Sequence, residues 1–253
     1  MKSCVTSFSF RFVSGHHLLN MMIDFPNPSL TPPKNGQRLK ITIFMDDADA
    51  WIVPWGERLG NTLSRHHDVE VCLPPSSLGG GDICFLLGCT KVLQREALER
   101  HTLNLVVHES ALPSGRGWSP VQWQILDRRD EIPVVMFQAT EEADAGPIFL
   151  RGSIKLDGTE LLPEIRFKQG AKTLEMVCRF LDLWPDIEPE MQEGDPTWYR
   201  RRNRDDDRLD VDSTLAAVFD QLRIADNEKY PTWFEHRGRR YLLKIFPTDD
   251  IGE

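Results

Sequence analysis

The chain has 253 residues and a mass of 29.1 kDa, and it is 40% hydrophobic and 27% charged, as is usual for soluble globular proteins. This length favours one principal domain with an appendage. The formal net charge of -9 argues against a broad nucleic-acid-binding surface. The sequence has no run of about 18 apolar residues, which argues against membrane insertion.

The cysteines do not form a compact framework, and they stand at Cys4, Cys72, Cys84, Cys89 and Cys178. We therefore expect free thiols that pack as small hydrophobic side chains in a reducing cytoplasm. Cys84 and Cys89 are too far apart for a paired zinc motif, and His66 and His67 are adjacent. No bound metal is expected.

Residues 1–37 lack the clean apolar core of a signal peptide, and the stretch DFPNPSLTPPKNG within them is rich in turn formers. We interpret this segment as a loosely ordered N-terminal extension. Met21 or Met22 is an alternative start of the chain.

Apolar runs alternate with helical patterns through residues 38–185. We expect strands at 39–47, 69–74, 82–88, 103–108, 132–140 and 146–156. Helices are expected at 50–66, 91–102, 118–130 and 170–185. This alternation predicts an α/β catalytic domain with a mostly parallel sheet flanked by helices.

Residues 186–253 differ in composition from the preceding domain. They begin with a charged, turn-rich linker, followed by a helix at 213–226 with a serine cap at Ser213. A β-hairpin at 232–246 is expected to turn at Arg237 and Gly238. We expect a small C-terminal appendage built from this helix and hairpin.

His108 ends the strand predicted at 103–108, and ligands of parallel sheets bind beyond the carboxyl ends of their strands. Considered alone, such a histidine is more often a hydrogen-bonded structural residue. Asp144 lies in a tight Asp-Ala-Gly-Pro-Ile turn after another apolar run. A carboxylate near an imidazole raises its basicity and fixes its tautomer, so this pair is suited to proton transfer.

Three short motifs carry a family resemblance: HESALP at 108–113, DAGPI at 144–148 and LLGCTKVL at 86–93. The first two resemble the His-Pro-Ser-Leu-Leu-Pro and Asp-x-Gly-Pro-Ile elements of formyltransferases that use 10-formyltetrahydrofolate. The resemblance implies a Rossmann-like formyltransferase fold and catalytic roles for His108 and Asp144. It also implies folate binding around Gly88, Lys91, Leu93, Phe137 and Asp144.

Two longer strings, residues 104–126 and 222–234, are similar to bacterial sugar N-formyltransferases. That resemblance implies formyl transfer to the amine of a nucleotide-linked 4-amino-4,6-dideoxy sugar. The acceptor it implies is GDP-perosamine, used in O-antigen and lipopolysaccharide synthesis. It also implies a homodimer.

One position departs from the family pattern. The usual sequence is Asn-x-His, but Val106 stands two residues before His108, and the nearest amide is Asn104. Residues 104, 106 and 108 share one face of a strand. Either a bulge brings Asn104 forward as a catalytic residue, or another donor such as Ser110 replaces it.

Acceptor contacts are expected after the catalytic strand and in the appendage. Trp118 is either a ring that lies against the ligand or an aromatic plug of a tight loop. The run containing Arg202 is either a diphosphate clamp or a solvated face balanced by residues 205–207. Ser110 and Tyr230 are also expected to bind the substrate, and smaller contributions to ligand or subunit contact are expected from Arg223 and Asp226.

Three alternative functions stay open. A methionyl-tRNA formyltransferase would need a basic surface and usually a larger C-terminal domain. A formyltetrahydrofolate hydrolase of the same family would release formate and need no sugar pocket. A non-catalytic sugar-nucleotide binding module would explain Val106 in place of the amide.

Overall fold

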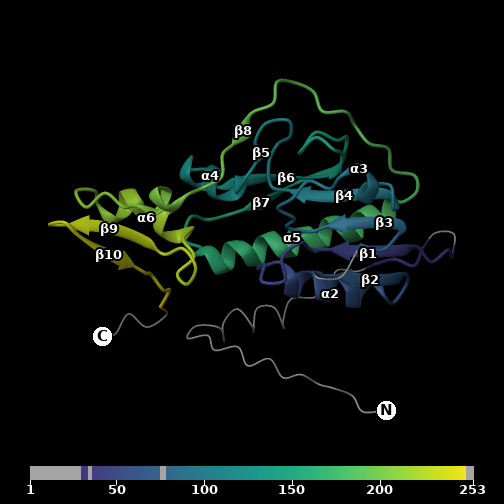
Figure 1. The fold of residues 1–253 in the computed structure, drawn as a ribbon, viewed down its shortest axis with the longest axis horizontal. Helices are drawn as coiled ribbons and strands as arrows, with labels where there is room; N and C mark the ends of the chain where they lie inside the picture. Colours follow the sequence, from purple (N-terminus) through teal and green to yellow (C-terminus); the bar gives the residue numbers. More distant parts are fainter. Residues whose placement is uncertain (1–29, 34–35, 75–77, 249–253) are drawn as a thin grey trace, which may run out of the picture.

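The computed structural model describes residues 30–33, 36–74 and 78–248. Most of the predicted N-terminal extension, and Cys4 with it, lies outside this part of the chain. Within the described residues the centre of the molecule is a six-stranded sheet of order β2-β1-β3-β4-β6-β7 (Figure 1). Its strands are β1 (Lys40–Phe44), β2 (Asp68–Cys72), β3 (Gly81–Leu86), β4 (His101–His108), β6 (Glu131–Gln138) and β7 (Ile148–Lys155).

The sheet is mostly parallel, which confirms the predicted fold class. Strands β2, β1, β3 and β4 run in one direction. Strand β6 is antiparallel to β4, and β7 is antiparallel to β6. An antiparallel β6 carries the chain away from the edge where His108 lies, so the loop 139–147 must fold back to reach that edge.

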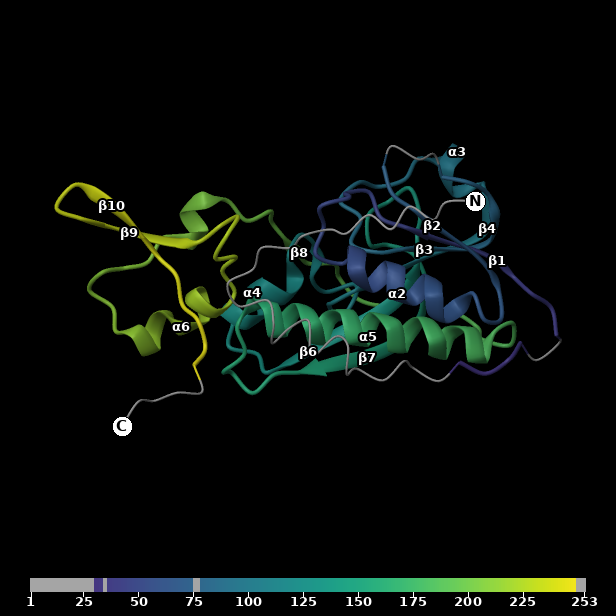
Figure 2. The same ribbon diagram turned by 90° about the horizontal axis from the view of Figure 1, so that it is seen from below.

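One face of the sheet is covered by two helices, α2 (Val53–Leu63) and α5 (Leu162–Leu183), which lie side by side (Figure 2). Helix α5 begins well before residue 170, where the sequence predicted its start. Pro163 stands in the first helical turn, where no intrahelical bond is lost. Gly170 is required by packing, because a Cβ there would lie 2.2 Å from Cε2 of Trp55 in α2.

The opposite face carries helix α3, whose Ala97 packs beside Cys84 and Leu86 of β3. Helix α3 spans only Arg95–Leu98, whereas a helix was predicted over 91–102. Its predicted end is instead the start of β4, because His101 pairs with Gly81 of β3. Helix α4 (Pro120–Leu126) lies within the range predicted for it, and it buries Val121 and Ile125 in the same core cluster as α2 and α5.

After α5 the chain crosses to this second face. We call residues 186–203 the strap. Glu190 forms a bridge with Ile148, and β8 (Trp198–Tyr199) pairs in parallel with β5 (Arg116–Gly117). Figure 1 shows the strap arching over the sheet. The segment predicted as a linker therefore packs on the loops that follow β4 and β6.

The C-terminal residues form a helix and a hairpin that extend to one side of the sheet (Figure 1). They comprise the 3-10 helix η1 (Arg204–Asp207), α6 (Leu215–Arg223), β9 (Thr232–His236) and β10 (Arg239–Leu243). The predicted turn is confirmed, since Arg237 and Gly238 have φ angles of 51° and 76°. The predicted cap is wrong by one residue: the Thr214 side chain accepts from the Ala217 amide, whereas Ser213 donates to Asp210.

The four cysteines of the described residues are free: Cys72, Cys84, Cys89 and Cys178. Burial raises the pKa of the Cys89 and Cys178 thiols to about 12, so they are protonated at neutral pH. No helix within the described residues combines the length and apolarity needed to cross a membrane.

Buried His101 gives the fold a dependence on pH. Its Nε2 lies 2.8 Å from Thr42 Oγ1, and Nδ1 has no hydrogen-bond partner among the described residues. Burial, and then the nearby Lys40 charge, lower its pKa below the ordinary value of 6.5. The unfolded chain therefore binds more protons below that pH, and the stabilisation present above it is lost on acidification.

We expect the free energy of unfolding to fall between pH 7.5 and 5.5, by up to about 1.4 kcal/mol for each pKa unit of lowering. Urea unfolding at both pH values measures this loss. His101→Gln cannot titrate, so its loss should be smaller, with the remainder including His67, whose pKa burial also lowers. An identical loss in His101→Gln and the original protein would contradict the assignment.

Candidate active site

His108 is the last residue of β4, and its side chain is only 10% exposed. Its Nε2 lies 3.0 Å from the carbonyl oxygen of Gly115. Because a carbonyl oxygen only accepts, Nε2 carries a proton and donates this bond. The ring also contacts Phe137 edge to face, with centroids 6.4 Å apart. The imidazole is thus held in one tautomer and one orientation.

Asp144 lies in the loop 139–147 with a φ of 53°, a conformation that aspartate adopts more readily than most residues. Its Oδ2 accepts from the Gly117 amide at 2.8 Å and lies 4.0 Å from His108 Nε2. That separation is too long for a direct hydrogen bond. The side chain is 17% exposed. The acid and the imidazole are neighbours, and a group bound between them can contact both.

The strap holds the Asp144 loop in place through Gln192. Its Nε2 donates to the carbonyl oxygens of Asp144 and Gly146 at 2.9 and 2.8 Å. Its Oε1 accepts from Arg116 Nη2 at 3.0 Å, and Arg116 Nη1 donates to Glu142 at 2.8 Å. The strap, β5 and the loop 139–147 are therefore joined by one polar network.

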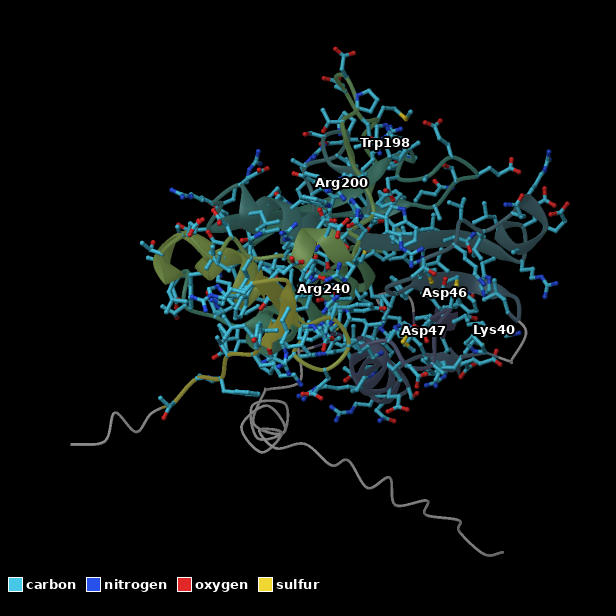
Figure 3. The ribbon with its side chains drawn as sticks, turned by 60° about the vertical axis from the view of Figure 1, so that its left-hand side comes forward. Lys40, Asp46, Asp47, Trp198, Arg200 and Arg240 are labelled. Atoms are coloured by element: carbon cyan, nitrogen blue, oxygen red, sulfur yellow. The ribbon has the colours of Figure 1, made fainter. Side chains whose placement is uncertain are left out.

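The strap also fixes the loop that follows His108. Thr197 Oγ1 accepts from the Gly115 amide at 2.9 Å. Gly115 has a φ of 83°, and a Cβ there would lie 2.8 Å from the Tyr199 ring and 3.0 Å from the Ser110 Cβ. Glycine is therefore needed at this position. Figure 3 shows Trp198 and Arg200 on the strap, and Asp46 and Asp47 just after β1.

Gln192 provides a prediction about positioning. Gln192→Leu removes two bonds to the Asp144 loop, and misplacing that carboxylate should lower kcat roughly ten- to hundred-fold while KM changes less. Steady-state turnover measures this, and amide exchange at Gly117 should become faster in the variant. The control is Gln221→Leu on α6, whose side chain makes one long bond to Arg208. Equal effects of the two substitutions would contradict the positioning role.

Asn104 and Val106 share the His108 face of β4, as the strand period predicted. Asn104 Nδ2 donates to Leu98 O at 2.8 Å, and its Oδ1 has no partner among the described residues. Val106 packs between two small apolar clusters that contain Phe137 and Leu86. No β-bulge moves Asn104 forward, because β4 stays in register with β3. The catalytic role of Asn104 stays a prediction, and the position of Asn104 deeper in β4 than His108 does not support it.

The residues predicted to bind folate lie around the end of β3 and on β6. Gly88 has a φ of 61°, and the amide of Lys91 donates to Asp46 Oδ2 at 3.0 Å. Leu93 packs beside the end of β3, and Phe137 is 2% exposed. Sequence reasoning missed Asp46, which also accepts from Thr90 and so holds this loop against β1.

Three of the residues predicted to bind the acceptor lie close to the strap or to the loop after β4. Ser110 is 2% exposed, and its hydroxyl has no partner among the described residues. Trp118 is 38% exposed and lies beneath Arg201, with Cζ 4.8 Å from the ring centroid. Arg202 is bound to Asp207 at 2.9 Å.

The predicted appendage residues divide into exposed and buried positions. Tyr230 is 62% exposed, and Lys229 beside it donates to Asp49 O in the loop after β1. Asp226 pairs with Arg166 at 3.0 Å. Arg223 is only 2% exposed, and its contact with a ligand or subunit stays a prediction that this burial does not favour.

A shallow hollow of about 410 Å³ between α2 and β2 is lined by Glu57, Gly60, Asn61, Ser64, Val69 and Val71. It lies beside the edge strand, away from His108. Residues 30–33, 36–74 and 78–248 contain no cluster of three histidine, cysteine or acidic side chains that could hold a metal ion.

Sequence comparison links the central part of the chain to a known family. The formyl transferase family model matches residues 77–171. The methionyl-tRNA formyltransferase of Thermus thermophilus is 29% identical over 168 residues, which cover 64% of this chain and 54% of that protein. The chain thus spans about half the length of the curated relatives that it matches.

Solved structures show that similarity of fold extends further. A methionyl-tRNA formyltransferase from Clostridium thermocellum has a TM-score of 0.69 at 19% identity, covering 84% of this chain and 95% of that chain. A likely sugar N-formyltransferase from Mycobacterium tuberculosis has a TM-score of 0.65 at 17% identity, covering 85% and 100%. HypX from Aquifex aeolicus, in complex with tetrahydrofolic acid, has a TM-score of 0.66 at 16% identity, covering 83% and 38%. The fold is that of the formyltransferases.

Proposed function

We propose that the protein is an N-formyltransferase that moves a formyl group from 10-formyltetrahydrofolate to the amine of a nucleotide-linked 4-amino-4,6-dideoxy sugar. The 4.0 Å approach of His108 Nε2 to Asp144 Oδ2, within the segment that matches the formyl transferase family, carries this proposal. GDP-perosamine is the acceptor that the sequence resemblance implies.

Formyl transfer to an amine has two requirements that this pair can meet. Negative charge develops on the formyl oxygen as the amine attacks, and the amine must lose a proton. His108 Nε2–H is a donor that can exchange its bond to Gly115 O for one to that oxygen. Asp144 Oδ2 is the nearby acceptor for the amine proton. The folate nitrogen gains one proton as its bond to the formyl carbon breaks, which compensates for the proton that the amine loses.

The residues near His108 fit a folate cosubstrate, which would supply the one-carbon group. A pterin needs an apolar slot with polar atoms at its rim. Leu93 and Val106 are partly buried apolar side chains, and the buried Phe137 packs against Val106. Ser110 Oγ and Asp46 Oδ1 are buried polar atoms without a partner among the described residues. Ser110 follows β4 and Asp46 follows β1, so both lie at the carboxyl edge of the parallel strands.

Net charge favours a sugar acceptor over transfer RNA. A tRNA-binding protein needs many phosphate contacts, and this chain carries a net charge of -9. Coverage of solved structures does not separate the two acceptors, because the similarity spans 100% of the likely sugar N-formyltransferase from Mycobacterium tuberculosis and 95% of the methionyl-tRNA formyltransferase from Clostridium thermocellum. Methionyl-tRNA formylation is the second candidate, because those curated relatives match in sequence. A homodimer stays a prediction.

The test supplies the full chain with 10-formyltetrahydrofolate and one acceptor at a time, followed by mass spectrometry. The acceptors are GDP- and dTDP-linked 4-amino-4,6-dideoxy sugars, methionyl-tRNA, and buffer alone. We expect a formylated nucleotide sugar together with an equal amount of tetrahydrofolate. Formylated methionyl-tRNA would establish the second candidate. Formate released at the same rate with or without acceptor would indicate the hydrolase, and binding without turnover would indicate the binding module.

A further inference from the structure

A run of arginines spans the end of the strap and the first residue of η1 in an otherwise acidic chain, and three of them pair with aspartates. Arg200 forms a bidentate pair with Asp206, and its hydrogen bond is the main cause that lowers the pKa of Asp206 to about 2. Arg202 binds Asp207 at 2.9 Å. Arg204 donates to Pro231 O and lies 3.8 Å from Asp207. These three guanidinium groups are engaged inside the appendage.

Arg201 is different. No aspartate or glutamate oxygen among the described residues lies within 4.0 Å of it, and the residue is exposed. Its guanidinium instead lies over the Trp118 ring, with Cζ 4.8 Å from the centroid. Stacking covers one face of the planar cation and leaves its N–H edges available. Arg201 is therefore oriented by Trp118 and has no carboxylate partner within the described part of the chain.

The Arg201–Trp118 pair is placed beside the candidate catalytic residues. Trp118 directly follows Gly117, whose amide binds Asp144 Oδ2 at 2.8 Å. The Trp118 amide donates to Tyr199 O at 3.1 Å, so β5 and the strap hold the two side chains together. An anion bound by Arg201 would lie at the rim of the site, next to the loop that carries Asp144.

We propose that Arg201, stacked on Trp118, binds the diphosphate of the acceptor and makes the enzyme select phosphorylated sugars over neutral ones. This inference rests on the proposed function. The N–H edges of arginine match two phosphate oxygens in a bidentate arrangement, which lysine cannot reproduce. Arg202, which the sequence pointed to, already binds Asp207 at 2.9 Å, although its Nη1 has no partner among the described residues.

The experiment measures dissociation constants of the full chain for GDP, for guanosine and for 5-formyltetrahydrofolate, a stable analogue of the cosubstrate. We expect Arg201→Gln to weaken GDP binding about ten- to hundred-fold and to leave guanosine and the folate unchanged. Arg201→Lys should recover only part of the loss. The control is Arg239→Gln on β10, which removes the same charge from another exposed arginine that lies over Tyr241.

Several outcomes would overturn this assignment. If Arg201→Gln and Arg239→Gln weaken GDP binding equally, the effect comes from the net charge of the protein and not from a site at Arg201. If Arg201→Gln weakens only folate binding, Arg201 belongs to the cosubstrate site. Unchanged KM for the nucleotide sugar in Arg201→Gln would remove Arg201 and leave the proposed function standing. The anion site can also hold while the proposed function fails. In that case GDP binding would need Arg201, but no nucleotide sugar would be formylated.

Discussion

His108→Gln is expected to lower the rate of formyl transfer by roughly a hundred- to ten-thousand-fold, because glutamine cannot deliver a proton or carry positive charge as the oxyanion forms. Its amide can replace the bond from Nε2 to Gly115 O, so the loop should keep its shape. Single-turnover formylation measures the loss. Circular dichroism and urea unfolding should show a folded protein, with a free energy of unfolding changed by at most about 1 kcal/mol.

Asp144→Asn is the companion variant. Asparagine tolerates the φ of 53° and keeps an oxygen for the Gly117 amide, but it cannot accept the amine proton. A similar loss is expected, and the double variant should lose little more than either single variant if the two groups act as a unit. Normal turnover in either single variant would remove that residue from the mechanism.

The largest expected effect on stability concerns Arg223, where α6 meets the turn before α5. Its Nε donates to Asp220 at 2.8 Å, and its Nη1 lies 3.5 Å from Glu160 Oε2. Burial of Glu160 opposes ionisation, but the Lys168 hydrogen bond and the Asp157 amide outweigh it and lower its pKa. Glu160 is therefore charged at neutral pH and 5% exposed.

Arg223→Met should cost about 3 kcal/mol in the free energy of unfolding, because it leaves a buried carboxylate with only its Lys168 and amide partners. Chemical denaturation measures the change. Adding Glu160→Gln removes the stranded charge and should restore part of the loss, as in a double-mutant cycle. A change below about 0.5 kcal/mol would show that the pair contributes little. Formylation should be nearly unaffected at temperatures where the variant stays folded.

Local patterns in the sequence were sufficient to predict the parallel strands and the position of His108 at the end of one of them. A β-branched apolar run followed by polar residues indicates a strand end, and β4 ends at His108 as predicted. The direction of β6 was not predictable, because an apolar strand has the same pattern whether its neighbour is parallel or antiparallel. The start of α5 was missed because Gly170 looks like a helix breaker until Trp55 is seen against it.

The strap was not predictable from local patterns. Residues 186–203 have no hydrophobic period, and their contacts reach back to β5 and the loop 139–147. Gln192 and Thr197 carry no motif, so only the tertiary structure shows that they hold the carbonyl and amide groups of the site. The arginine run was visible in the sequence, but the choice of Arg201 over Arg202 depends on which guanidinium already has a carboxylate.

A crystal of the full chain soaked with 5-formyltetrahydrofolate and GDP would show whether both ligands meet at His108. We expect the folate ring to lie at the carboxyl edge of β3 and β4, with its formyl-bearing end within contact distance of His108 and Asp144, and the diphosphate to reach Arg201. Density for the folate at any other edge of the sheet, or the His108–Asp144 gap closed by packed side chains in the ligand-bound crystal, would contradict this expectation.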